Sequence, residues 1–265
     1  MGNYETGFTV VLPCAGSGAR LKLKGPKELF EILSGIRLID FSLAHIGATL
    51  PLSGIKVAVV IRPGKEEVVE HVRRKLPGIR VKKVFFNDSY YEWPGSVFSA
   101  RSTFSDNNLV LLPDSILNVG GIPAGSEKVP ICRDHKGFTL IKSVIDGLSA
   151  YKVVFGWIPC DDRQELKNLG ALRVEEGMVT AFQDKPVDSF ESYNGYWGCY
   201  AFRKEVGESL YRFLVNSVRR RPTSLAEQSF HPAAAIRLHS YRDLGTWPAI
   251  RRFRQEHLTG SNIPK

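Results

Sequence analysis

The residues best suited to chemistry gather in a loop that follows the first apolar segment of the chain. Gly16 and Gly18 stand there with Ser17 between them, and Arg20 and Lys27 follow closely. Glycines allow backbone N–H groups to approach a phosphate closely, because no Cβ stands in the way. An arginine can grip outer phosphates through two hydrogen bonds, and a lysine supplies a compact positive charge. The loop therefore predicts a site for a free nucleoside triphosphate whose α-phosphate reacts.

Two other phosphate-binding loops fit this segment poorly. A dinucleotide-binding loop needs a third glycine where Leu21 stands. A Walker loop needs Gly-x-x-x-x-Gly-Lys followed by Ser or Thr, and the segment lacks that spacing. A plain tight turn would explain the glycines alone, but it would not explain the Pro-Lys pair at residues 26–27.

This loop resembles the NTP-binding loop of the sugar-1-phosphate nucleotidyltransferases, whose signature is Gly-x-Gly-x-Arg followed by Pro-Lys. The resemblance implies that Arg20 stabilises the departing pyrophosphate and that Lys27 stabilises the α-phosphate. The short spacing between them is closer to the uridylyl- and cytidylyltransferase branches than to the thymidylyltransferases. The resemblance further implies which residues bind the NTP, some in and before the loop and some at the start of a helix beside the base. They are Leu12, Cys14, Ala15, Gly16, Ser17, Gly18, Gly95 and Ser96.

Two aspartates follow in the order that this family shows. Asp114 comes directly after the apolar strand predicted at Leu109–Leu112, and Asp243 begins an Asp-x-Gly-Thr motif. A carboxylate at the end of a parallel strand projects toward the ligand crevice, where it can hold Mg²⁺ on phosphate oxygens. The resemblance implies that both aspartates bind Mg²⁺ for an in-line nucleotidyl transfer. Taken singly, each would also suit a turn or a helix entry, the latter with Thr246 as N-cap.

The acceptor site is implied by two further segments. Gln183-Asp184-Lys185-Pro186 resembles the family's Glu-Lys-Pro, in which the lysine contacts the acceptor's phosphate and the acid contacts a sugar hydroxyl. Asp184 is one methylene shorter than the usual glutamate. The segment from Asn194 to Tyr200 resembles an aromatic strand that supplies sugar contacts, with Asn194 as an acceptor-site group and a bulky Trp197 in place of a small or polar residue. Aromatic residues along a strand equally suit a core.

The elements that must position these residues alternate between strands and helices. In the first half, apolar β-branched runs predict strands and amphipathic stretches predict helices. Such alternation indicates βαβ units, and the resemblance implies a GT-A-like domain. We expect an α/β fold with a single Rossmann-like (GT-A-like) domain whose mostly parallel mixed sheet is flanked by helices. The strands are expected at Phe8–Leu12, Ile55–Ile61, Ile79–Phe86 and Leu109–Leu112, and the helices at Leu38–Ala48, Glu66–Leu76 and Gly95–Phe104.

The second half is more mixed. Strands at Leu172–Glu175 and Met178–Phe182 flank Glu176-Gly177, which is a hairpin signal. No internal repeat or linker interrupts the chain, so we expect one domain over residues 1–265, with an NTP-binding part at about 8–115 and an acceptor-binding part at about 139–257. Residues 118–136 resist assignment. Further strands are expected at Val153–Ile158, Tyr196–Phe202 and Ile236–Ser240, and helices at Val206–Val215 and Thr246–His257.

Composition narrows the class of protein. The 265 residues are 43% hydrophobic and 24% charged, which is typical of a globular chain, and no apolar run reaches membrane-spanning length. The first residues carry neither a basic nor an apolar export region, so we expect a cytoplasmic protein with no membrane partner. The four cysteines lie far apart, which favours reduced buried thiols over disulfides or zinc.

The net charge of +9 suits nucleic acid, an anionic surface or small polyphosphate substrates. The basic clusters, such as residues 73–75 and 219–221, fall on predicted helices or their ends, where solvated faces are the simpler explanation. We therefore expect an NTP and a phosphorylated small molecule as partners, and no nucleic acid. A homo-oligomer is compatible with the sequence.

The sequence thus predicts a Mg²⁺-dependent nucleotidyltransferase that transfers an NMP from an NTP to a phosphorylated acceptor, with sugar-1-phosphates as the expected class. Phosphocholine, phosphonates and cyclitol phosphates remain open as acceptors, and the base is not identified. Two rival interpretations are a non-catalytic nucleotide-binding homologue, favoured by Asp184 and Trp197, and a nucleic-acid-associated protein, favoured by the charge.

Overall fold

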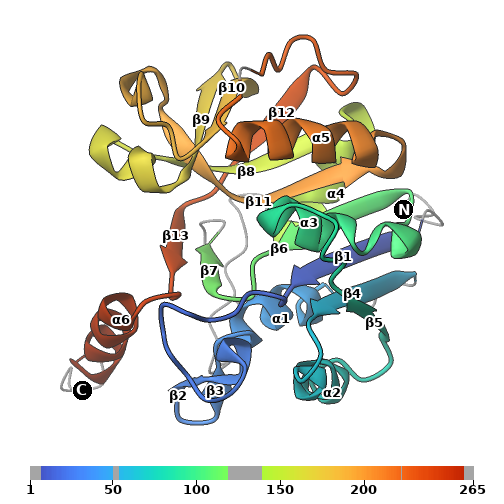
Figure 1. Cartoon of the computed structure of the whole chain (residues 1–265), viewed down its shortest axis with the longest axis vertical. Helices are drawn as coiled ribbons and strands as arrows, with labels where there is room; N and C mark the ends of the chain where they lie inside the picture. The colour runs from blue at the N-terminus through green and yellow to red at the C-terminus, as the bar shows by residue number, and fades with distance from the viewer. Residues whose placement is uncertain (1–6, 50–53, 119–138, 222, 260–265) are drawn as a thin grey trace.

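A nine-stranded sheet forms the centre of the molecule, and its first half is parallel (Figure 1). The computed structural model describes residues 7–49, 54–118, 139–221 and 223–259. Four neighbouring strands run in the order β5-β4-β1-β6, and each pair is parallel. Their apolar, β-branched sequences suit a sheet that is covered on both faces. These strands are β1 (Phe8–Pro13), β4 (Ile55–Ile61), β5 (Arg80–Phe85) and β6 (Asn107–Leu111).

Helices cover both faces of the sheet. α1 (Asp40–Gly47), α2 (Glu66–Lys75) and α4 (Leu140–Ala150) pack on one face. α3 (Glu92–Phe98) and α5 (Gly207–Val218) pack on the other. Successive residues of β1 illustrate this, because Val10 and Leu12 enter the first core layer while Val11 enters the second. The expected α/β class with flanking helices is confirmed.

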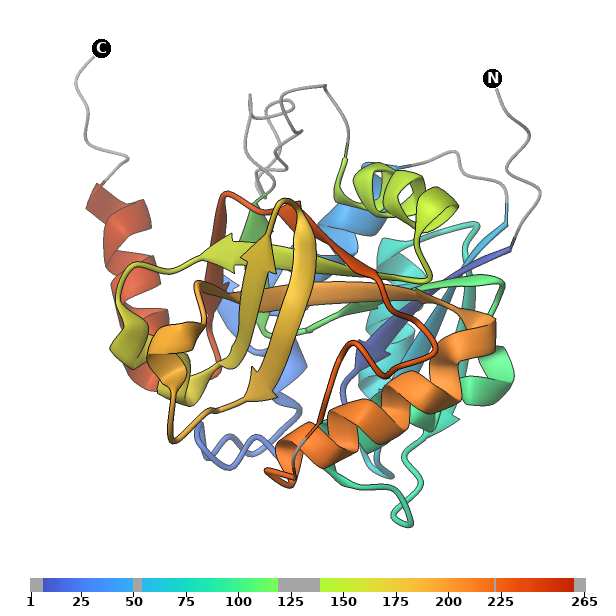
Figure 2. The ribbon, with the colours of Figure 1, turned by 90° about the horizontal axis from the view of Figure 1, so that it is seen from above.

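The second half of the sheet curls into a small closed barrel. β11 pairs with β6 and then with β8, and the order continues through β12 and β10 to β9, which returns to β11 (Figure 2). All pairings from β6 onward are antiparallel except that of β8 with β12. The barrel strands are β8 (Val153–Pro159), β9 (Gly170–Glu175), β10 (Met178–Asp184), β11 (Gly195–Arg203) and β12 (Ala233–Arg237).

The expectation of a mostly parallel sheet is therefore wrong for the second half. One of its antiparallel pairs, that of β9 with β10, follows directly from the short connection between the two strands. Glu176 and Gly177 both adopt positive φ angles, 50° and 78°, as the two central residues of a tight hairpin turn require. A two-residue turn can join only antiparallel strands, whereas a parallel pair needs a long crossover.

Small elements complete the fold. β2 (Glu31–Leu33) pairs with β3 (Ile36–Arg37), and β7 (Ser115–Asn118) pairs with β13 (Ser240–Asp243). The chain then enters α6 (Trp247–Thr259), where Thr246 Oγ1 accepts a hydrogen bond from the Ala249 amide at 3.5 Å. Short 3₁₀ turns lie at Lys27–Leu29, Arg101–Thr103, Arg163–Asn168, Phe190–Ser192 and Lys204–Val206.

The largest differences between predicted and observed boundaries concern two elements. The helix expected to begin at Gly95 begins at Glu92 and ends at Phe98, so Ser96 lies inside it and not at its cap. The strand expected at Ile236–Ser240 spans the gap between β12 and β13. Of the segment 118–136, only Asn118 is described, at the end of β7.

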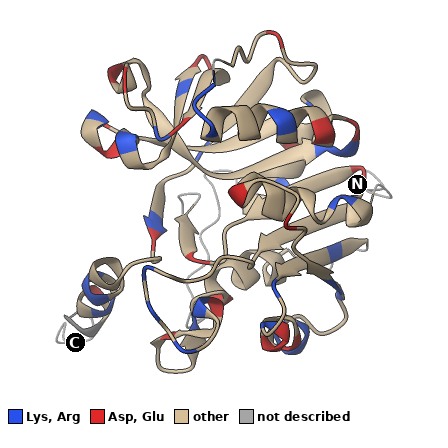
Figure 3. Ribbon diagram, in the orientation of Figure 1, with Lys and Arg blue, Asp and Glu red and all other residues tan. Residues whose placement is uncertain are grey.

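Several composition-based expectations can be compared with the described residues. Three cysteines, at positions 14, 160 and 199, are free and buried, and Cys132 lies outside the described residues. No helix in the described ranges has both the length and the hydropathy needed to cross a bilayer. Both signs of charge occur on α2 and α5 (Figure 3), where Glu70 pairs with Arg73 and Glu208 with Arg212. The lack of a nucleic-acid partner and the division into two functional parts stay predictions.

Candidate active site

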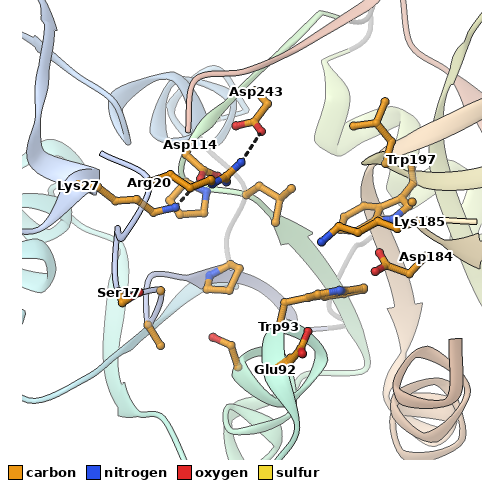
Figure 4. A pocket seen from close by; sticks show the side chains of 18 of the residues that line it. Ser17, Arg20, Lys27, Glu92, Trp93, Asp114, Asp184, Lys185, Trp197 and Asp243 are labelled. Carbon is orange, nitrogen blue, oxygen red and sulfur yellow. Dashed lines mark hydrogen bonds and ion pairs between the residues drawn. The ribbon is translucent and has the colours of Figure 1, made fainter. Parts of the chain in front are cut away.

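A pocket of about 660 Å³ opens between the parallel half of the sheet and the barrel (Figure 4). It lies beyond the carboxyl ends of β1 and β6. Here the strand order changes direction, because β4 and β5 follow on one side of β1 and β6 is added on the other side. Open α/β sheets bind ligands at this kind of switch point. The lining residues are Pro13, Ala15, Gly16, Ser17, Arg20, Lys27, Arg62, Phe86, Glu92, Trp93, Ser96, Leu112, Pro113, Asp114, Asn168, Leu169, Gly170, Asp184, Lys185, Trp197, Tyr241 and Asp243.

The glycine loop forms one wall of the pocket. Ala15, Gly16 and Ser17, three of the residues predicted to bind the NTP, line it. Leu12 and Cys14 do not, because both side chains are fully buried in the core beneath the loop. Gly18 lies outside the lining set and makes the turn that follows, with a φ of +68°.

A buried ion pair, Lys65 with Glu28, holds this loop from behind. The Lys65 ammonium lies 3.0 Å from the Glu28 carboxylate, whose side chain is fully buried. Burial raises the pKa of Glu28, while Lys65 opposes that rise. Lys65 Nζ also donates to the carbonyls of Cys14 at 2.9 Å and of Gly16 at 2.7 Å. A trans peptide points its N–H opposite to its C=O. The amide that follows each of these carbonyls, that of Ala15 and that of Ser17, therefore faces away from Lys65.

Two cation–carboxylate pairs occupy the centre of the pocket. Lys27 Nζ lies 2.5 Å from Asp114 Oδ2, and both side chains are 14% exposed. Burial by itself would lower the pKa of Lys27, but the charge of Asp114 and the hydrogen bond to it outweigh burial and raise the pKa. Arg20 lies 3.5 Å from Asp243 and is far more exposed. In Figure 4 these four side chains point toward one another.

The pairing of β7 with β13 brings Asp114 and Asp243 to the same pocket, although 128 residues lie between them in the sequence. In the ladder of β7 with β13, Asp243 stands opposite Ser115, and the Leu244 amide donates to the Asp114 carbonyl at 2.8 Å. Asp243 Oδ1 accepts from the Gly245 amide at 2.6 Å, which fixes its orientation. The Asp-x-Gly-Thr motif thus orients a carboxylate and also begins α6.

These two carboxylates fit the ligand preferences of Mg²⁺. That ion is usually held by one or two carboxylates together with substrate phosphates and water. In the structure each aspartate is paired with a positive group, Lys27 with Asp114 and Arg20 with Asp243, which a metal ion would have to replace. No cluster of three or more His, Cys, Asp or Glu side chains suited to a metal occurs within the described ranges. A metal here would need oxygens from its substrates.

The opposite wall comes from the barrel and from α3. Asp184 and Lys185, which the sequence predicts to bind the acceptor, line it at the end of β10 together with Trp197 and Trp93. Asp184 is only 8% exposed. Burial raises the pKa of its carboxyl group; the charge of Lys185 opposes this rise and Glu92 adds to it. The Asp184 amide donates to Ser217 Oγ at 2.8 Å, which anchors the strand end on α5.

Two predicted site residues do not enter the pocket. Asn194 joins β9 to the loop before β11, because its side chain accepts from the Val174 amide at 2.9 Å and donates to the Val174 carbonyl at 2.7 Å. Gly95 is packed against Tyr90, and a Cβ there would lie 2.8 Å from the Tyr90 carbonyl carbon. By contrast Ser96 lines the pocket, and its buried hydroxyl has no hydrogen-bond partner among the described residues.

Sequence reasoning missed Arg62, which follows β4. Its guanidinium donates to Asp88 at 2.6 Å and to the Ala15 carbonyl at 3.2 Å, and it lies 4.4 Å from the centre of the Phe86 ring. It also missed Glu92, Trp93 and the Lys65–Glu28 pair. The only sequence signal for Arg62 and Phe86 was their place at strand ends, since Arg62 directly follows one predicted strand and Phe86 is the last residue of another.

Comparison with known proteins gives a fold but no sequence relative. No family model and no curated protein matches the sequence. A structure of UDP-glucose pyrophosphorylase from Acinetobacter baumanii is similar to this chain with a TM-score of 0.69 and 15% identity, over 95% of this chain and 93% of that one. The inositol-1-phosphate CTP transferase from T. maritima is similar with a TM-score of 0.63 and 14% identity, over 98% of each chain. The chain therefore has the fold of the sugar-phosphate nucleotidyltransferases.

Proposed function

We propose that this protein is a nucleotidyltransferase that transfers an NMP from an NTP to a phosphorylated small-molecule acceptor and releases pyrophosphate. The observation that carries this proposal is the convergence of Arg20, Lys27, Asp114 and Asp243 between the glycine loop and an opposite wall that contains Lys185. This arrangement suits two phosphorylated molecules that bind with their phosphate groups facing each other. The similarity to the two transferase folds supports it, and a GT-A-like description of the domain belongs to the same proposal.

In the proposed reaction, an oxygen of the acceptor's phosphate attacks the α-phosphorus of the NTP. The bond from that phosphorus to the bridging oxygen breaks, and pyrophosphate leaves with the electron pair. The protein supplies position and charge and forms no covalent bond. Arg20 stabilises the pyrophosphate, Lys27 the α-phosphate and Lys185 the acceptor's phosphate. The loop amides after Cys14 and Gly16 are free to donate to the NTP, and Ser96 lies beside it.

Asp114 and Asp243 are the residues that would hold Mg²⁺ in this proposal. When bound there, the ion neutralises charge on the phosphates. Lys27 and Arg20 would then pair with phosphate oxygens in place of the carboxylates, because those oxygens offer equivalent charged acceptors.

The test is pyrophosphate release from ATP, GTP, CTP, UTP or dTTP, with Mg²⁺, in the presence of a panel of phosphate monoesters. We expect one or two nucleotides to support release and to raise the unfolding midpoint. A nucleotide at 100 times its dissociation constant adds about 2.7 kcal/mol of stability. A midpoint shift without pyrophosphate release from any acceptor would favour a non-catalytic nucleotide-binding homologue.

A further inference from the structure

The acceptor end of the pocket contains an uncommon combination of two indole rings and two carboxylates. The ring centres of Trp93 and Trp197 lie 5.0 Å apart with their planes tilted by 35°. Asp184 and Glu92 line the same region and are near enough for Glu92 to act on the Asp184 carboxyl group. In Figure 4 the Trp93 ring lies between these two carboxylates.

Asp184 is a buried carboxylate, and within the described part of the chain no lysine or arginine lies close enough to form an ion pair with it. The charges of Lys185 and Arg220 act on it only from a greater distance. The Trp93 indole favours its charged form by hydrogen bonding. In Figure 4 the Lys185 ammonium extends toward the centre of the pocket, where the phosphates are proposed to lie. Burying a carboxylate without a paired cation is unfavourable. A bound cation would offset that cost, whereas a sugar hydroxyl would offer only a neutral hydrogen bond.

The indole rings favour the same kind of ligand. The face of an aromatic ring attracts a cation, most strongly for tryptophan, and nearby carboxylates add to the negative potential. Trp197 is held firmly in place, because its indole lies so close to Gly170 that a Cβ there would be 1.8 Å from Nε1. Glu92 has a left-handed backbone with a φ of 45°, which is unfavourable for a residue with a side chain and is found at functional sites.

We propose that the acceptor is a phosphate or phosphonate ester whose other end carries a positively charged ammonium group, bound by Trp93, Trp197, Asp184 and Glu92. This inference rests on the proposed function and narrows its acceptor from the expected sugar-1-phosphates to an aminoalkyl or quaternary ammonium ester. The phosphate end lies among the cations of the pocket, and the ammonium end lies among its carboxylates and rings. Opposite charges at its two ends thus set the direction in which the acceptor binds.

The test compares phosphocholine with 3,3-dimethylbutyl phosphate, which has the same shape but no positive charge. Each is titrated by calorimetry into the full chain saturated with Mg²⁺ and an α,β-methylene nucleotide, and pyrophosphate release is measured separately with the natural nucleotide. Phosphoethanolamine and glucose-1-phosphate complete the panel. We expect phosphocholine or phosphoethanolamine to bind at least about tenfold more tightly than the neutral isostere, as one cation–π contact and one charge pair would give.

Two variants locate the effect. Asp184→Asn keeps the side-chain shape and is expected to weaken binding of the ammonium esters about tenfold while leaving the neutral isostere unchanged. Glu92→Gln is expected to act in the same direction. The matched control is Glu67→Gln, an exposed glutamate in the first turn of α2. The neutral isostere tests the proposal on the unmodified chain, so a variant that fails to fold does not prevent a decision.

The outcomes separate this inference from the proposed function. Pyrophosphate release with glucose-1-phosphate, together with equal binding of phosphocholine and its neutral isostere, would overturn the ammonium site and leave the transferase intact. Tight, charge-dependent binding of phosphocholine without release from any acceptor would reject the transferase and retain the site. Failure of every ester to bind would overturn the inference.

Discussion

At the scale of single residues, Lys27 is the group on which the proposed reaction depends most. Its ammonium is fixed beside Asp114 at the centre of the pocket. Removing one electrostatic stabiliser of a transition state typically costs roughly 10²–10³ in turnover. We predict a loss of this size in kcat for Lys27→Ala, measured by pyrophosphate release from the folded variant.

The matched control for this change is Lys24→Ala, which removes an exposed lysine from the same loop. It is expected to keep near wild-type turnover. If Lys27→Ala also kept it, the assignment of this lysine to the reacting phosphate would be wrong.

Single residues also show how far sequence reasoning could reach at the site. Arg20, Lys27, Asp114, Asp184, Lys185 and Asp243 were predicted from motifs and all line the pocket. Motifs carried this information because they join the residue type to its place after a strand. Asn194 was misplaced because an asparagine beside an aromatic strand looks the same whether its amide faces a ligand or, as here, the Val174 main chain. Lys65 and Glu28 were missed because burial of a charged side chain depends on contacts 37 residues apart.

At the scale of elements, the Lys65–Glu28 pair connects the start of α2 to the glycine loop. Lys65→Met would leave the Glu28 carboxylate buried and unpaired, which typically costs about 3–5 kcal/mol. We predict a lower unfolding midpoint and a raised KM for the NTP, because the carbonyls of Cys14 and Gly16 lose their donor.

A second variant separates the loss of stability from the rise in the KM for the NTP. Adding Glu28→Gln to Lys65→Met removes the unpaired charge, so much of the lost stability should return. The KM for the NTP should stay high, because the loop carbonyls still lack Lys65. A double variant with wild-type KM would mean that the pair supports folding only and does not position the loop.

The contact of Gly170 in β9 with Trp197 in β11 gives a prediction for the barrel wall. A Cβ at position 170 would lie 2.4 Å from Trp197 Cδ1, so the indole or the strand must move. Overpacking of this kind typically costs about 1–3 kcal/mol. We predict that Gly170→Ala lowers the unfolding midpoint and raises the KM of the acceptor, while the KM of the NTP stays unchanged.

Gly47→Ala serves as the comparison, since nothing lies within 4 Å of the added Cβ. It should leave the midpoint and both KM values near those of the wild type. An unchanged acceptor KM in Gly170→Ala would show that the position of Trp197 does not matter for the acceptor.

The elements themselves were predictable to different degrees. β4 matches its predicted range because seven consecutive residues are mostly β-branched and bounded by turn residues. β2, β3 and β7 were missed, since two to four residues carry no usable periodicity. The closure of β9 on β11 was also beyond the sequence, because strand pairing between distant segments depends on the whole packing arrangement.

At the scale of the whole molecule, stability should depend on pH through His45. This side chain is buried on the inner face of α1, its Nε2 donates to the Leu117 carbonyl at 3.2 Å, and burial lowers its pKa from 6.5 to about 4. The unfolded chain therefore binds a proton below pH 6.5 that the folded chain takes up only near pH 4. Stability contributed by neutral His45 is complete above pH 6.5 and is lost as the pH falls toward 4, by roughly 3 kcal/mol in total.

We predict that His45→Gln removes this component, so that its unfolding midpoint falls less than that of the wild type between pH 7 and pH 4.5. Calorimetric scans across this range measure it. His239→Gln, at an exposed histidine, should follow the wild-type curve. Parallel curves for all three proteins would contradict a buried neutral His45.

The closure of the barrel has a consequence for how copies of this protein can associate. Because β9 turns back to pair with β11, β5 is the one strand of the nine-stranded sheet that keeps an unpaired side among the residues that the structure describes. Arg80, Lys82 and Lys83 stand exposed along that strand, and charges of one sign oppose a second copy there. Even if they were neutralised, a sheet with one open side can be extended only once. Continuous strand-by-strand growth into a fibre, which needs two open sides on every subunit, is therefore excluded for this sheet while the barrel stays closed.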